Sequence, residues 1–110
     1  MAQPVKLTAP RIRVVLDTAG DGTLTEYEVQ TDNRDAVRWD MTRGREHWPA
    51  MMDAPMLWAT FMSWSAMNRA GDFAGNFAEF NECALEASAI RDEAGDMAEV
   101  GPTPAAPAPL

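Results

Sequence analysis

The chain has 110 residues, of which 46% are apolar, and it carries a formal net charge of -8. This length fits one domain with a modest hydrophobic core. The acidic balance argues against a general nucleic-acid binder, because neutralising phosphate groups needs clustered Lys and Arg. No run of residues is long and apolar enough to cross a bilayer, so we expect no membrane span.

Residues 1–10 contain Pro4 and Pro10 and predict a short extended lead. They lack the apolar run that a signal peptide needs, so we expect no export. The single cysteine, Cys83, cannot form an internal disulfide, and this fits a reducing cytosol.

Residues 11–31 predict two β-strands. In residues 11–16 apolar β-branched residues alternate with Arg, and in residues 23–31 Thr, Tyr and Val share one parity while Glu and Gln share the other. Both patterns are typical of half-buried strands. Between them, residues 19–22 (AGDG) have the composition of a tight turn, and the segment therefore predicts a β-hairpin.

The same segment, DTAGDGTLTEYE from Asp17 to Glu28, spells most of a calcium-binding EF-hand loop. Asp17, Asp21 and Glu28 fall at ligand positions 1, 5 and 12, and Gly22 falls at position 6. Ala19 occupies position 3, where it offers no ligand oxygen. An EF-hand also needs a helix on each side, whereas both flanks have strand patterns. We favour the hairpin and keep a calcium site as the alternative.

Residues 33–91 predict three helices. The first is capped by Asp32 or Asn33 and ends before Pro49. Its predicted apolar stripe consists of Val37, Met41, Gly44 and Trp48. Trp39 falls on the opposite face, where we expect it to pack on an Arg or to meet a partner.

The second helix is predicted to begin at Asp53, with Pro55 in its first turn, and to end at Gly71. One wide face is formed by Met56, Leu57, Phe61, Trp64 and Met67. Trp58 and Met62 extend the apolar surface round the helix, which predicts either a central place in the fold or burial in a partner. We expect the Trp58 and Met62 side to be an interface.

The third helix is predicted from Asn76, with Glu79 completing a capping box. Its predicted stripe consists of Phe77, Phe80, Ala84 and Ala87. The fold class is therefore α+β: an N-terminal β-hairpin followed by a small three-helix bundle, in one folded domain over residues 11–91. Residues 92–110 are acidic and then Pro/Ala-rich, and they predict a disordered tail.

No group of residues predicts catalysis. His47 is the only histidine and has no partner at metal-ligand spacing. Cys83 has no neighbour in the sequence that would lower its pKa. The glycines Gly20 and Gly22 lie in the predicted turn and form no phosphate-binding loop. We predict a protein-binding protein that is not an enzyme and has no cofactor or metal.

Three short elements of the helical part resemble a known family. They are RWDMTR at residues 38–43, HWP at residues 47–49, and DAPMLWATF at residues 53–61 with the following Trp64, Ala66, Arg69 and Gly71. In this order after a hairpin, they resemble the tail assembly chaperones of long-tailed actinobacteriophages. The resemblance covers about residues 11–91.

The resemblance implies a chaperone that coats the tape measure protein, which is largely helical and aggregation-prone, and that recruits tail tube protein. Such families commonly add a frameshifted longer form, so this chain would be the short form and the longer one a partner. The implied location is the host bacterial cytoplasm, not the mature virion, with no nucleic acid or membrane as partner. Assembly into a homo-oligomer is left open.

The candidate client-binding residues are Trp39, Trp58, Met62 and Trp64. The alternative for all four is packing in the core of the domain, and this alternative is favoured for Trp64. Two other functions stay open: a minor virion neck or connector protein, and a calcium-binding regulator built on the EF-hand-like loop.

Overall fold

In a computed structural model of the protein, residues 7–90 are described. The elements in chain order are β1 (Arg11–Leu16), β2 (Thr25–Gln30), α1 (Asn33–Glu46), α2 (Pro55–Ala70), α3 (Phe77–Cys83) and β3 (Ala84–Ile90). The fold is α+β, as the sequence predicts. Residues 1–6 and 91–110, with the predicted disordered tail, lie outside the described residues.

The three strands form one antiparallel sheet in the order β2-β1-β3. The β1–β2 hairpin confirms the prediction made from residue alternation. Ile12, Val14 and Leu16 of the central strand are fully buried, and in β2 Val29 is buried while Glu26 and Glu28 face solvent. This pattern identifies the covered face of the sheet as the one that carries the apolar parity.

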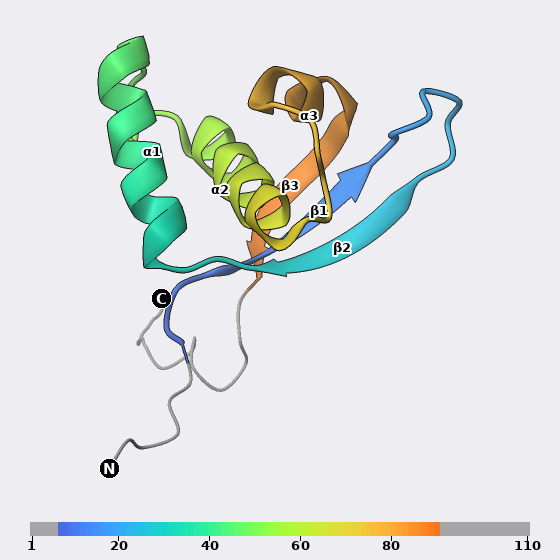
Figure 1. The fold of residues 1–110 in the computed structure, drawn as a ribbon, viewed down its shortest axis with the longest axis horizontal. Helices are drawn as coiled ribbons and strands as arrows, with labels where there is room; N and C mark the ends of the chain where they lie inside the picture. The colour runs from blue at the N-terminus through green and yellow to red at the C-terminus, as the bar shows by residue number, and fades with distance from the viewer. Residues whose placement is uncertain (1–6, 91–110) are drawn as a thin grey trace, which may run out of the picture.

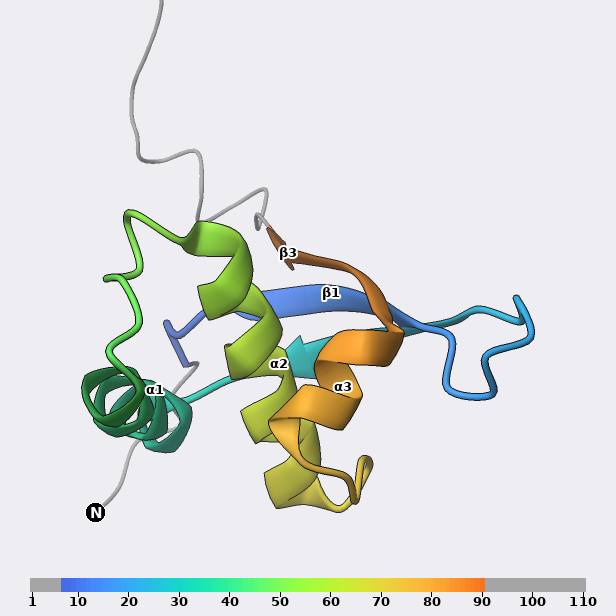
Figure 2. The ribbon, with the colours of Figure 1, turned by 90° about the horizontal axis from the view of Figure 1, so that it is seen from above.

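Helix α2 lies over that covered face and crosses the strands, with α3 beside it (Figures 1 and 2). Helix α1 packs against α2 on its other side. Helix α2 has Pro55 in its first turn and is capped by Gly71 in a left-handed conformation, as predicted. The prediction of Asp53 as its N-cap is wrong, because Ala54 holds that position and no side chain caps the helix start. None of the helices within residues 7–90 has the length and apolar character of a membrane span.

The core is centred on Phe61 of α2, which is 1% exposed. The centroid of its ring lies 5.6 Å from that of Trp39 of α1 and 6.0 Å from that of Trp48 in the loop after α1. The rings of Trp64 of α2 and Phe77 of α3 are each 5.3 Å away. These are centroid distances of favourable aromatic pairs. One side chain therefore holds all three helices together.

The predicted three-helix bundle is not confirmed, because the third helix is short. It starts at Asn76 with the predicted capping box, in which the Glu79 backbone N–H donates to the Asn76 side chain. It then ends at Cys83, and residues 84–90 pair with β1 as a third strand. Pairing there satisfies the second row of backbone groups of the central strand, which outweighs the helix propensity of Ala84 and Ala87.

Helix α1 also presents a different face to the core from the one predicted. Val37 and Met41 of the predicted stripe are 46% and 65% exposed, whereas Trp39 is 4% exposed. The buried face instead carries Asp35 and Trp39, which are four residues apart and therefore lie together on a helix. The hydrophobic pattern could not indicate this face, because it includes a buried carboxylate at Asp35.

We predict that Phe61→Ala lowers the free energy of unfolding by about 3–5 kcal/mol, since it removes a buried aromatic ring and leaves a cavity. Met52→Ala, at a side chain that is 85% exposed, should change it by less than about 0.5 kcal/mol. Urea denaturation followed by Trp fluorescence measures both. Equal effects of the two substitutions would contradict the described core.

Candidate interaction surface

The structure places three of the four predicted client-binding residues in the core. Trp39 is 4% exposed, Met62 2% and Trp64 8%, while Trp58 is half-buried and packs against the core. The prediction of an exposed Trp39 and of an interface through Met62 is therefore wrong. The physical reason is that the sheet, α1 and α3 surround α2, so its apolar girth is covered within the domain.

Within the described part of the chain, Trp64 makes contacts through both its ring edge and its ring face. Its indole Nε1 donates to the Gly75 carbonyl at 2.9 Å. The Arg38 guanidinium lies 4.1 Å from the ring centroid, in a cation–π contact. Both the polar edge and one face of the ring are thus used internally, which confirms the alternative that the sequence favoured for this residue.

The exposed apolar side chains lie instead in the segment from α1 to the first turn of α2. Five of the eight large hydrophobic residues that are exposed in the described part of the chain fall between residues 37 and 56. They are Val37, Met41, Met51, Met52 and Met56. We call this set the methionine segment. In the chain, the set runs from α1 through the connecting loop to the first turn of α2, and Figure 2 shows that α1 and this loop lie on the side of α2 away from α3.

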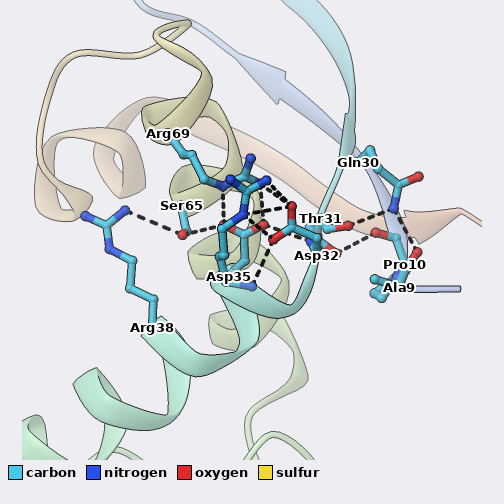
Figure 3. Close-up of polar contacts among 10 residues, drawn as sticks. Ala9, Pro10, Gln30, Thr31, Asp32, Asp35, Arg38, Ser65 and Arg69 are labelled. Carbon is cyan, nitrogen blue, oxygen red and sulfur yellow. Dashed lines mark hydrogen bonds and ion pairs between the residues drawn. The ribbon is translucent and has the colours of Figure 1, made fainter. Parts of the chain in front are cut away.

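A buried polar network fixes α1 on α2 and so positions the methionine segment (Figure 3). Asp35 has no solvent exposure. Its carboxylate accepts hydrogen bonds from the Ser65 hydroxyl at 2.7 Å, the Arg69 guanidinium at 2.7 Å and the Asp32 backbone N–H at 2.9 Å. The charge is therefore paired and hydrogen-bonded, which is the condition under which a buried carboxylate is tolerated.

Asp32 caps the same helix end from outside the core. Its carboxylate accepts hydrogen bonds from the Arg34 backbone N–H at 2.9 Å and from the Arg34 guanidinium at 2.6 Å. The Arg34 side chain, with smaller effects from its backbone N–H and from Arg69, lowers the pKa of Asp32 from 3.8 to about 2. The cap therefore stays ionised at neutral and mildly acidic pH.

The EF-hand-like loop closes on itself between two strands. The Asp17 carboxylate accepts from the backbone N–H groups of Asp21 at 3.2 Å and Gly22 at 3.1 Å, and Glu28 lies in β2, 2.9 Å from Arg11. Strands on both sides contradict the flanking helices that the calcium alternative requires. Within residues 7–90, no group of three or more acidic, His or Cys side chains is placed to hold a metal ion.

The remaining reactive side chains have structural surroundings. Cys83 is half-buried at the end of α3, and burial raises the pKa of its thiol, so the thiol stays protonated at neutral pH. His47 ends α1 in a left-handed conformation with φ 61, and its backbone N–H is part of the helix cap. The raised pKa agrees with the absence from the sequence of a neighbour of Cys83 that would lower it.

Comparison with protein-family models found no family that matches this chain. Searches of curated proteins and of solved structures likewise found no match. The resemblance to tail assembly chaperones therefore stays a prediction, supported by the sequence elements between residues 38 and 71.

We predict that Asp35→Ala lowers the free energy of unfolding by about 3 kcal/mol, because it removes the buried carboxylate bonded to Ser65 and Arg69 and leaves Arg69 with its longer contact to Asp32, at 3.4 Å. Asp53→Ala, at an exposed aspartate, should cost less than about 0.5 kcal/mol. The double variant Asp35→Ala with Arg69→Met should recover part of the loss, since it removes both charges. Urea unfolding tests this, and no recovery in the double variant would contradict the pairing.

The Asp32 cap predicts a specific acid dependence. A carboxylate whose pKa is lower in the folded state stabilises the fold above its unfolded pKa, near 3.8, and the contribution is lost as the pH falls towards about 2. Asp32→Asn keeps a good N-cap but cannot ionise. As the pH is lowered from 5 to 2, the melting temperature should therefore fall less steeply for Asp32→Asn than for the parent or for the control Asp53→Asn. Parallel curves for all three would contradict this role.

Proposed function

We propose that this protein is the short, non-frameshifted form of a tail assembly chaperone of a long-tailed actinobacteriophage. It would bind the tape measure protein and promote tail tube assembly without catalytic activity. Two observations support the proposal: the sequence elements at residues 38–43, 47–49 and 53–61, and the exposed methionine segment on a small acidic domain. The methionine segment is the observation that carries it.

Methionine suits a client made of many similar apolar helical stretches. Its unbranched, polarisable side chain adapts to differently shaped partners. Covering one such side chain contributes about 1.5–3 kcal/mol before the cost of association is subtracted. A few methionines therefore give weak single contacts, and many chaperone copies along one long client would act together through multivalency.

The buried tryptophans have a supporting part in this proposal. Trp39 and Trp64 hold α1 and α2 around Phe61, and the two helices carry the methionine segment between them. Trp58, which is half-buried, is the one originally predicted contact residue that retains access to a client. The client-binding role is thus transferred from Trp39, Met62 and Trp64 to exposed residues.

The proposed partners and location follow from the same function. Besides the tape measure protein, they are the frameshifted longer form of the chaperone and the tail tube protein, with self-association left open. The site of action is the host bacterial cytoplasm, and the chain would be absent from the mature virion. The net charge of -8 would keep the chaperone and its apolar client in solution.

Co-expression with the tape measure protein should give a soluble complex on pull-down. Met52→Asp with Met56→Asp should abolish it, because both side chains are exposed and two charges would enter the contact. The fold should survive, since Asp is favourable in the first turn of a helix, where Met56 lies. Leu85→Asp is the matched control, at an exposed apolar residue on β3, and should bind the client as the parent does.

Equal loss with Leu85→Asp, or retention in the double variant, would contradict the methionine segment as the contact. Mass spectrometry of purified phage particles separates the proposal from a neck or connector protein. The chaperone should be absent from the particles, and its presence at stoichiometric levels would favour the virion component.

A further inference from the structure

Strand β2 is an edge strand with no partner on its outer side. The sheet order is β2-β1-β3, and no other strand within residues 7–90 pairs with that edge. Figure 1 shows β2 along the open side of the sheet, with the helices above it. An open edge presents a row of backbone N–H and C=O groups that can pair with another chain.

The register shows which backbone groups point outward. The Thr31 N–H donates to the Pro10 carbonyl at 3.2 Å, one step beyond the paired residues Gln30 and Arg11. Residues of an antiparallel pair alternate between bonded and non-bonded positions. Thr31, Val29 and Tyr27 therefore direct their backbone groups to β1, whereas those of Glu26, Glu28 and Gln30 are free to pair with an added strand.

A cavity opens beside the same edge, between β2 and the C-terminal end of α2. Its volume is about 150 Å³. Its walls combine the less polar side chains of Tyr27, Val29, Ala66, Met67 and Ala70 with the polar ones of Glu28, Gln30, Arg69 and Asp72. Small-molecule sites usually have volumes of about 300–1,000 Å³. A cavity of roughly 150 Å³ accommodates a benzene-sized group. This one therefore has room for one side chain, whose apolar atoms would lie against Val29, Ala66 and Met67.

We propose that the outer edge of β2 binds an extended segment of a partner protein in which apolar and basic residues alternate. The segment would add to the sheet as a fourth strand. Side chains opposite Tyr27 and Val29 would face α2, where one of them enters the cavity. Side chains on the other face would meet Glu26 and Glu28, which are paired with Arg13 at 3.0 Å and Arg11 at 2.9 Å. The two glutamate side chains are still 56% and 59% exposed, so each can take a lysine or arginine of the added strand as a second partner.

Charge also argues against a second copy of this chain as the occupant. Pairing of two β2 strands would bring Glu26 and Glu28 of one copy against the same glutamates of the other, and like charges across strands are destabilising. The net charge of -8 opposes self-association in the same direction. The inference does not depend on the proposed chaperone function, since it concerns a surface separate from the methionine segment.

The test uses the full 110-residue chain and a fluorescein-labelled peptide, Lys-Leu-Lys-Leu-Lys-Leu-Lys. A scrambled peptide of the same composition, Leu-Lys-Lys-Lys-Lys-Leu-Leu, has the same charge without the alternation. Fluorescence anisotropy should show tighter binding of the alternating peptide. Ala70→Phe, at an exposed residue in the cavity wall, should weaken that binding about tenfold or more, because burial of one leucine side chain is lost.

Ala78→Phe, at an exposed alanine of α3, is the matched control and should bind as the parent does. Glu28→Pro is a second variant: it removes an outward N–H, which an edge strand tolerates, and should also weaken binding. Amide shifts on peptide addition should centre on residues 26–30. Equal binding of the two peptides, unchanged binding in both edge variants, or shifts confined to residues 37–56 would each overturn the proposal. A dimer formed through β2 would also overturn it.

Discussion

The packing of Phe61 is the interaction on which the rest of this domain depends. Four aromatic rings from α1, the following loop, α2 and α3 meet around it, with centroids 5.3 to 6.0 Å away. A chain of this size has one small core, and here aromatic side chains make up much of it. Three of the four tryptophans belong to that cluster, so they hold the helices in place and are not free to bind a partner.

The surface follows from this constraint. Once Trp39 is turned towards Phe61, the opposite face of α1 must carry Val37 and Met41 into solvent. Asp35 lies on the buried face with Trp39. Its hydrogen bonds to Ser65 and Arg69 offset the cost of removing the carboxylate from water. The exposure of Met41 thus follows from the burial of Trp39, and it leaves an adaptable side chain at the surface, where the proposed client would bind.

Much of the fold could be predicted from the sequence. Alternation of residue types predicted the hairpin, and Pro55, Gly71 and the Asn76–Glu79 capping box predicted helix ends correctly. Strand β3 could not be predicted, because ALEASAI has high helix propensity and becomes a strand only by pairing with β1. The predicted buried face of α1 was wrong for a related reason, because a buried Asp35 is stabilised by Arg69, which is 34 residues away in the chain. The predicted interaction residues were wrong for the same reason, since the exposure of Met41 and the burial of Trp39 are evident only once α1 is placed on α2.

The central claim is that methionine, and not tryptophan, meets the client. The direct measurement is methyl NMR of the chain labelled at its eight methionines, with and without the tape measure protein. Signals from Met41, Met51, Met52 and Met56 should shift or broaden on complex formation, while those from the buried Met62 and Met67 should keep their positions. Changes at Met62 and Met67 with constant signals from the exposed four would contradict the account, because they would mean that the core opens to bind.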